Sequence, residues 1–225
     1  MIVKVCGVTS LDDGKQALDA GADWIGLNLV SGPRKIELAH AMRIAAGLID
    51  PSRAVALFAA DNGSEWLRAL AEIRAAGVHR VQLYGQVTPQ AIREPVELGF
   101  ESLFVHAAAS PSDIESAGAF LKSCGSRPPG FILLDSAGAT QLGGTGRRAD
   151  WNAIAAARLA GKMSDWPPML LAGGLTPENV QEAIRMVLPD GVDVSSGVES
   201  SPGRKDISKV HRFIQSIRSA TPPCR

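Results

Sequence analysis

Short apolar segments alternate with amphipathic segments along the whole chain. The apolar segments are strand-sized and often rich in Val, Ile and Leu, a composition typical of parallel strands that are buried on both faces. Eight strands are predicted, at residues 2–7, 24–30, 54–59, 80–85, 102–107, 131–136, 169–174 and 191–196.

The segments between these strands carry the signals of helix ends. LDDGKQALDAG follows the first strand and ends on Gly21, a residue type that commonly terminates helices. SEWLRALAEIRAAG begins with Ser64 as a candidate N-cap and stops at Gly77. In TPENVQEAIRMVL, Thr176 is expected to cap a helix and Pro177 to take its first position. RKDISKVHRFIQSI is expected to form the last helix of the chain.

Eight strand–helix units in 225 residues predict a (β/α)8 TIM barrel. A doubly wound open sheet is the alternative, but it normally carries a G-x-G-x-x-G turn after its first strand, and the turn here reads CGVTS. No linker rich in Pro, Gly and Ser divides the chain, so residues 1–225 are expected to form a single α/β domain.

The charge balance bears on the partners of the protein. Lys plus Arg and Asp plus Glu both number 23, and no basic stripe typical of nucleic-acid binding is present. The apolar segments are shorter than the roughly 20 residues of a membrane span. The chain begins with the strand pattern MIVKVCGVTS and not with an export signal. We therefore expect a cytoplasmic protein that binds neither nucleic acid nor membranes.

The cysteines and histidines give no sign of a metal site or a disulfide framework. The three cysteines, Cys6, Cys124 and Cys224, are far apart, and the four histidines are scattered. Neither a CxxC motif nor a Cys/His pair at metal-binding spacing is present. A reducing compartment and no structural metal are expected.

Three glycine-bearing segments follow the sixth, seventh and eighth predicted strands: GGTG, AGGL and SSGVE. Glycine lets backbone N–H groups approach an anion closely, and the loops after strands seven and eight of such barrels commonly hold phosphate. Simple turns are the alternative, but three such segments together favour a phosphate site. Its predicted residues are Gly144, Gly146, Gly173, Gly174, Ser195, Ser196 and Gly197.

Asp193 interrupts the apolar run of the eighth strand. If Val192 and Val194 face the helices, alternation points Asp193 into the barrel. The carboxylate then either belongs to a polar network at the top of the barrel or binds substrate hydroxyls, and the sequence leaves both possibilities open.

Cys6 and Asp135 end the first and sixth strands, where barrel active sites form. Alone, the cysteine reads as a small buried residue and the aspartate as a helix cap or turn former. Around a phosphate pocket the pair could act as base and acid. Burial behind four apolar residues favours the protonated form of Asp135, and nearby donors would favour the thiolate of Cys6.

With these residues in place, the chain resembles the phosphoribosylanthranilate isomerase family of tryptophan biosynthesis. The resemblance runs from residue 3 to about residue 213, and the combination of its motifs is highly specific. The matching motifs are VKVCGVTS, GADWIGL, GPRKI, VQLYG, LLDS, GGTGRRADW, LAGGLTPENV and GVDVSSGVESSPGRKD.

The resemblance implies an enzyme that performs the third step from chorismate to tryptophan. The step is the Amadori rearrangement of N-(5-phosphoribosyl)anthranilate to 1-(2-carboxyphenylamino)-1-deoxyribulose 5-phosphate, without cofactor or metal. It implies that Asp135 protonates the furanose ring oxygen and that Cys6 removes the C2 proton. Arg34, otherwise readable as a solvated loop arginine, would pair with the anthranilate carboxylate. A monomer or a homodimer is expected, with a small phosphosugar as its ligand.

Two features depart from the family pattern. Tyr84 stands where the family usually has His, and the loop NLVSGPRKI before Arg34 is shorter than usual and lacks its aromatic residue. Two alternatives therefore stay open: a related barrel isomerase for another aminated sugar phosphate, and a phosphosugar-binding barrel without turnover.

Overall fold

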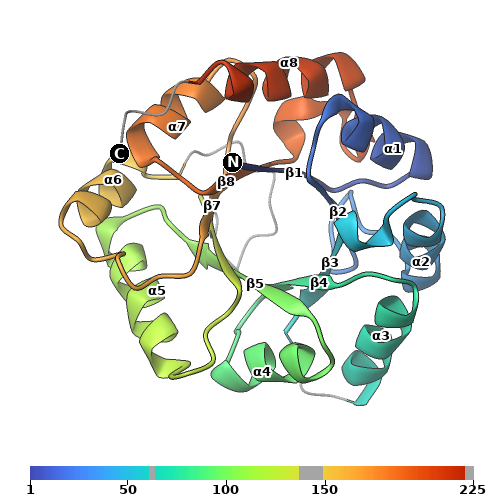
Figure 1. The fold of residues 1–225 in the computed structure, drawn as a ribbon, viewed down its shortest axis with the longest axis horizontal. Coiled ribbons are helices and arrows are strands. Elements are labelled where there is room, and N and C mark those ends of the chain that lie inside the picture. The colour runs from blue at the N-terminus through green and yellow to red at the C-terminus, as the bar shows by residue number, and fades with distance from the viewer. Residues whose placement is uncertain (61–63, 137–148, 221–225) are drawn as a thin grey trace.

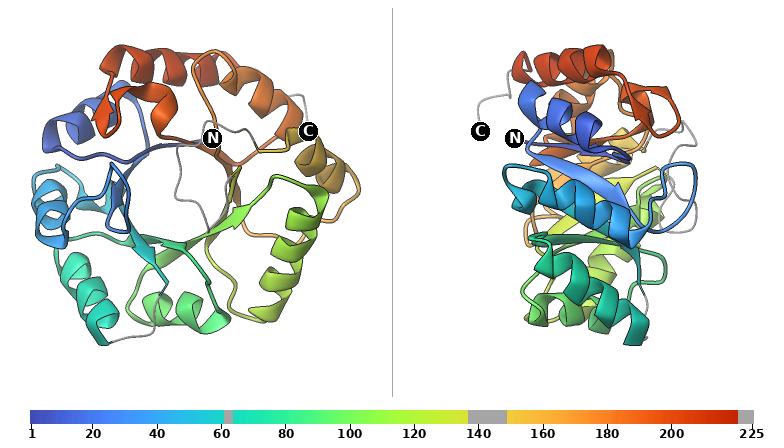
Figure 2. Two further views of the ribbon diagram at one scale, coloured as in Figure 1. Left: turned by 180° about the vertical axis from the view of Figure 1, so that it is seen from behind. Right: turned by 90° about the vertical axis from the view of Figure 1, so that its right-hand side faces the viewer.

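A computed structural model describes residues 1–60, 64–136 and 149–220 of the chain. Eight parallel strands pair in chain order, from β1 to β8, and the last pairs with the first to close a barrel. Figures 1 and 2 show the helices as an outer ring around these strands. The predicted (β/α)8 TIM barrel is confirmed.

All eight predicted strands are present, and several end earlier than expected. The prediction for β7 ran on to Gly174, but the strand ends at Leu171, shortly before Gly173 and Gly174, which both have positive φ. The strands are β1 (Ile2–Cys6), β2 (Trp24–Asn28), β3 (Ala54–Ala59), β4 (Arg80–Tyr84), β5 (Glu101–Ala107), β6 (Phe131–Asp135), β7 (Met169–Leu171) and β8 (Gly191–Val194).

The outer ring contains α1 (Leu11–Ala20), α2 (Leu38–Ala46), α3 (Ser64–Ala75), α4 (Pro89–Glu97), α5 (Pro111–Ser123), α6 (Trp151–Leu159), α7 (Val180–Val187) and α8 (Ile207–Arg218). Gly21 ends α1 in the left-handed conformation, as predicted. The predicted start of α7 is wrong. The side chain of Asn179 accepts a hydrogen bond from the Thr176 backbone N–H, so residues 176–179 form a turn before the helix begins.

Side-chain alternation divides the apolar residues into two layers. Leu133 packs in the barrel interior, whereas Ile132 and Leu134 face the helices. At the amino end of the barrel, Trp24 and Phe131 meet edge to face with their ring centroids 5.1 Å apart. Aromatic side chains therefore fill the interior at that end, and the buried polar residues Lys4, Gln82 and Asp193 lie further along their strands.

A two-stranded antiparallel hairpin, β9 (Glu199–Ser201) and β10 (Arg204–Lys205), was not predicted. It follows the 3-10 turn η3 (Ser196–Val198) and precedes α8. Its sequence ESSPGRK is polar and lacks the apolar alternation from which strands are recognised. The hairpin brings the charged residues at its two ends back toward the barrel.

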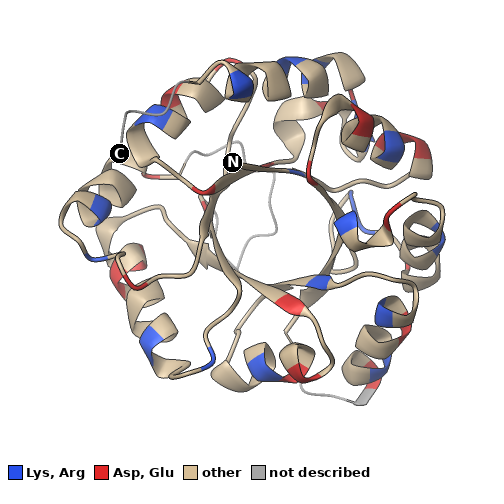
Figure 3. Cartoon of the chain, in the orientation of Figure 1, with Lys and Arg blue, Asp and Glu red and all other residues tan. Residues whose placement is uncertain are grey.

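The outer surface carries both signs of charge, and Figure 3 shows Lys and Arg interspersed with Asp and Glu over the helices. In the part of the chain that the structure describes, no helix has the length and apolar character needed to cross a membrane.

The interior layer yields a stability prediction. Leu133→Ala, which truncates a fully buried side chain, should lower the free energy of unfolding by about 2–5 kcal/mol because it leaves a cavity inside the barrel. Urea unfolding measures the loss. Leu159→Ala is the matched control, since Leu159 is 90% exposed, and it should change stability by less than about 0.5 kcal/mol. Equal losses in both variants would contradict the layered core.

Candidate active site

Cys6 and Asp135 end β1 and β6 at the same rim of the barrel, as predicted. Cys6 is 6% exposed and belongs to the interior apolar cluster. Asp135 is half-buried and accepts a hydrogen bond from the Ser136 hydroxyl at 3.1 Å. The structure thus places a thiol and a carboxyl group at the end of the barrel where catalytic residues are found.

Gly26, the register partner of Cys6 on β2, makes room for two side chains. A Cβ atom at this position would lie 2.7 Å from Cys6 Sγ and 3.2 Å from Lys4 Nζ. The sulfur and the ammonium group therefore both lie against the same point of the β2 backbone.

Lys4 and Asp193 form an ion pair inside the barrel. They are register partners on β1 and β8, and Lys4 Nζ lies 2.8 Å from Asp193 Oδ1. Lys4 is completely buried and Asp193 is 7% exposed. Val192 and Val194 pack in the outer apolar layer, so the predicted inward direction of Asp193 is correct. Its observed partner fits the polar network; contact with a substrate hydroxyl stays a prediction.

The charges near Cys6 oppose one another. Burial raises the pKa of the Cys6 thiol, and the Asp193 carboxylate raises it further. Lys4 lowers the pKa through its charge and a hydrogen bond, and Lys205 lowers it through its charge. The net pKa of the Cys6 thiol is raised. The nearby donors expected from the sequence are present, but burial outweighs their effect on the pKa.

Lys4 itself stays protonated. Burial alone would lower the pKa of its ammonium group, but the charges of Asp193 and Cys6 and their hydrogen bonds raise it above the ordinary value. A permanent positive charge thus lies beside the thiol.

Arg34 is not a solvated loop arginine. Its guanidinium donates Nε–H to one oxygen of Glu199 at 2.8 Å and a terminal N–H to the other at 2.7 Å. A Cβ at Gly7, the residue after Cys6, would collide with Arg34 Cδ. The Arg34 side chain therefore lies across the end of β1, beside the thiol.

Glu199 receives a second cation from the hairpin. Lys205 Nζ donates to Glu199 Oε1 at 2.8 Å and to the backbone carbonyl of Cys6 at 2.5 Å. Burial alone would raise the pKa of Glu199, but Arg34 and Lys205 together lower it below its ordinary value. This cluster of Arg34, Glu199 and Lys205 fastens the hairpin and the loop after β2 to the end of β1.

The predicted phosphate segments lie partly together. A Cβ at Gly173 would lie 2.6 Å from the Ser136 backbone nitrogen, and a Cβ at Gly197 would collide with the Leu175 carbonyl oxygen. Ser195 Oγ faces Gly7, where a Cβ would lie 3.1 Å from it. The loops after β6, β7 and β8 are thus in close contact, with Gly174 and Ser196 within them.

Phosphate binding by these loops stays a prediction, and the predicted Gly144 and Gly146 lie outside the described residues. Among the residues that are described, no three His, Cys, Asp or Glu side chains gather in a way that could hold a metal ion.

Tyr84 ends β4 and is 8% exposed. Its hydroxyl accepts a hydrogen bond from Gln82 Nε2 at 2.8 Å. Burial raises the pKa of the phenol well above its ordinary value, and the charges of Cys6, Asp193 and Asp135 raise it further. Tyr84 therefore stays protonated and lies within electrostatic range of both predicted catalytic groups.

Sequence reasoning missed Lys4, Glu199, Lys205 and Gln82. A usable signal existed for Lys4, which interrupts the apolar strand VKV as Asp193 interrupts VDV. For Glu199 and Lys205 the signal was two opposite charges at the ends of ESSPGRK, which indicates a pair only once the hairpin is known.

Comparisons with known proteins identify the relatives of this chain. A family model described as N-(5'-phosphoribosyl)anthranilate (PRA) isomerase matches residues 3–216. An N-(5'-phosphoribosyl)anthranilate isomerase of Magnetococcus marinus is 35% identical over 97% of this chain and 95% of its own. One from Myxococcus xanthus is 36% identical over 96% of both chains.

Solved structures give the same result. The crystal structure of phosphoribosyl anthranilate isomerase from Thermotoga maritima is similar with a TM-score of 0.81 and 30% identity, over 97% of this chain and 99% of that one. A phosphoribosyl anthranilate isomerase in complex with reduced 1-(o-carboxyphenylamino)-1-deoxyribulose 5-phosphate has a TM-score of 0.79 and 29% identity, over the same shares of the two chains.

The Glu199 cluster yields a pH-dependent prediction. Glu199→Gln should lower the free energy of unfolding at neutral pH by about 3 kcal/mol, because two cations lose their buried counter-charge. The folded pKa of Glu199 lies below its ordinary 4.5, so its contribution is present above pH 4.5 and is lost as the pH falls through the folded value. Urea unfolding measured across this pH range should show that the difference in unfolding free energy between wild type and Glu199→Gln becomes smaller as the pH falls.

Glu115→Gln is the control for this series, because Glu115 forms an exposed pair with Lys162 at 3.3 Å. It should change stability little at any pH. A Glu199→Gln gap that stays constant down to the acid end would contradict the ionic role of the carboxylate.

Proposed function

The chain belongs to the N-(5'-phosphoribosyl)anthranilate isomerase family, and on this premise we propose that it catalyses the Amadori rearrangement of N-(5'-phosphoribosyl)anthranilate in tryptophan biosynthesis. The observation that carries the proposal is the placement of Cys6 and Asp135 at one rim of the barrel, with Arg34 fixed beside the thiol. This arrangement supplies an acid, a base and a carboxylate-binding group around one opening.

Asp135 is the general acid in the proposed reaction. Its proton goes to the furanose ring oxygen while the bond between C1 and that oxygen breaks, and the amine nitrogen forms a Schiff base with C1. The Ser136 hydroxyl donates to one carboxyl oxygen of Asp135 at 3.1 Å and so helps to hold the carboxyl group at the rim.

Cys6 is the general base. Its thiolate removes the proton from C2, and the electron pair moves toward the protonated nitrogen, which gives an enolamine that tautomerises to the ketone. Because this nitrogen is an adequate electron sink, the steps require neither a metal nor a redox cofactor. The charge of Lys205 favours the thiolate.

Arg34 binds the anthranilate carboxylate in this proposal. Glu199 accepts from two of the five N–H donors of the guanidinium, and the proposal assigns the remaining donors to the substrate carboxylate. The other end of the substrate, its phosphate, is assigned to Gly173, Gly174, Ser195–Gly197 and the GGTG segment.

The proposal extends to the setting of the enzyme. We expect it in the cytoplasm as a monomer or a homodimer. A similar crystal structure, with a TM-score of 0.79, is described as that of monomers generated from the dimeric phosphoribosylanthranilate isomerase of Thermotoga maritima.

Turnover tests the two catalytic assignments. Cys6→Ala and Asp135→Asn should each lower kcat by roughly 10²–10⁴-fold, the usual contribution of a general base or acid. The assay follows the loss of substrate fluorescence, with phosphoribosylanthranilate made in situ from anthranilate and phosphoribosyl pyrophosphate by the preceding transferase.

Cys124→Ala is the matched control, because it removes a buried cysteine at the end of α5, which leads to the amino end of β6 and not to the rim. It should keep wild-type turnover. Wild-type rates in Cys6→Ala or Asp135→Asn would remove that residue from the mechanism. Fluorescence loss at only the spontaneous rate with the wild-type protein would contradict the proposed reaction and favour another aminated phosphosugar.

A further inference from the structure

The ion pair between Lys4 and Asp193 has no part of its own in the acid–base steps, yet it occupies the barrel interior next to the base. Lysine is almost never fully buried, and taking two charges out of water costs about as much as their attraction returns. Apolar side chains of similar volume would fill the same space at equal or better stability. Stability alone therefore gives no reason for this pair.

The geometry relates the pair to the Cys6 sulfur. Lys4 and Cys6 are two residues apart on β1 and so point to the same face of the strand, and Gly26 leaves the space in which Nζ and Sγ meet. An ammonium group has three N–H donors. One is given to Asp193 at 2.8 Å, and Cys6 Sγ lies against the same point of the β2 backbone as Nζ.

We propose that Lys4 is a positioning residue of the isomerase reaction: its ammonium group, held by Asp193, stabilises the Cys6 thiolate and fixes the sulfur at the rim. The inference rests on the proposed function in one respect, namely that Cys6 is the base. When the thiol ionises its proton leaves to solvent, and the Lys4 charge compensates the negative sulfur. The thiolate then accepts the C2 proton of the substrate.

Asp193 has two opposed effects in this arrangement. It keeps Lys4 charged and in place, but its own negative charge disfavours a second anion nearby. The pKa of the thiol therefore lies between two limits. It would be higher without a neighbouring cation, and it would be lower beside a cation that had no carboxylate partner.

The other charges around Cys6 come from several elements. Cations lie on the loop after β2 and on β10, a phenol lies on β4, and a carboxylate that acts on this phenol lies on β6. These groups, with the ion pair itself, are Lys4, Arg34, Tyr84, Asp135, Asp193 and Lys205. Substituting Lys4 or Asp193 leaves the other five side chains in place, so each substitution changes one member of the ion pair.

The proposal predicts that Lys4→Met and Asp193→Asn shift the ionisation of Cys6 in opposite directions. Lys4→Met removes the cation and should move the ionisation of Cys6 to higher pH by about one unit or more. Asp193→Asn removes the anion, which leaves the Cys6 thiolate as the counter-charge of Lys4, and should move the ionisation of Cys6 to lower pH by a similar amount. A purely structural role would lower stability in both variants without shifting the thiol in opposite directions.

The ionisation is measured directly by the ultraviolet absorbance of the thiolate as a function of pH. Each protein is compared with the same protein carrying Cys6→Ala, so that Cys124, Cys224 and the one tyrosine of the chain cancel in the difference. This readout does not depend on turnover. In parallel, the acid limb of kcat/KM against pH should follow the same shifts.

Lys4→Met leaves Asp193 without its partner and can prevent folding. The double variant Lys4→Met/Asp193→Leu removes both charges together, and its thiol should ionise between the two single variants. Asp193→Asn tests the downward shift independently, since it retains the Lys4 side chain beside the thiol.

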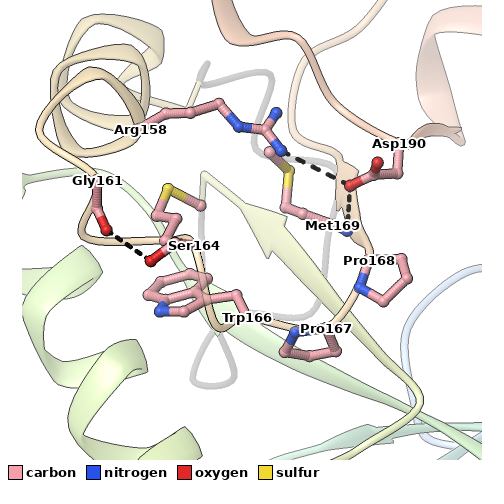
Figure 4. Close-up of a pocket in the computed structure, with 9 residues that line it drawn as sticks. Arg158, Gly161, Ser164, Trp166, Pro167, Pro168, Met169 and Asp190 are labelled. Carbon is pink, nitrogen blue, oxygen red and sulfur yellow. Dashed lines mark hydrogen bonds and ion pairs between the residues drawn. The ribbon is translucent and has the colours of Figure 1, made fainter.

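Arg158→Met is the matched control. Figure 4 shows Arg158 on the wall of a pocket of about 330 Å³, directed toward Asp190, which in turn accepts the Met169 backbone N–H. Arg158 and Asp190 lie 3.7 Å apart at the amino end of the barrel, opposite the thiol. The substitution should lower the unfolding midpoint and leave the Cys6 titration unchanged.

Unchanged titrations, or shifts of the same sign in Lys4→Met and Asp193→Asn, would overturn the proposal even in an active isomerase. Opposite shifts that kcat/KM does not follow would overturn the link between Lys4 and the reaction. A wild-type protein without turnover would contradict the proposed function, and this result is visible before any variant is made.

Discussion

The barrel closes where β1 pairs with β8, and the buried ion pair of Lys4 and Asp193 crosses this seam. Both residues point inward because side chains alternate along a strand, and the same alternation brings Cys6 to the interior two positions later. The end of β1 places three groups. They are the thiol, the Arg34 side chain, which lies over Gly7, and the Lys205 ammonium, which binds the Cys6 carbonyl. The position of the chemistry thus depends on the closure of the sheet.

Burial and charge compete at this place. An interior position excludes water from the Cys6 sulfur and disfavours its anion, whereas the cations on either side favour it. A base whose strength is set by such a balance can be adjusted by small changes in charge, with no change of fold. The cations are themselves tied to carboxylates, Lys4 to Asp193 and Lys205 to Glu199, so that the interior carries few uncompensated charges.

The hairpin β9–β10 extends this arrangement beyond the barrel. Glu199 at its start and Lys205 at its end bind each other, and Glu199 also binds Arg34 from the loop after β2. A hairpin that is distant in sequence thereby fixes the arginine that the proposed mechanism requires for the substrate carboxylate. A barrel loop that is polar in sequence acts here as a structural clamp.

The sequence by itself determined the eight strands, the inward direction of Asp193 and the placement of Cys6 and Asp135 at strand ends, because these follow from patterns within about ten residues. It failed where local signals compete, as at Thr176, whose turn delays the start of α7. Only the tertiary structure decided that Lys4 pairs with Asp193, 189 residues away, and that Arg34 is held by Glu199. Strand register and barrel closure create these contacts, and neither is encoded in the periodicity of a single segment.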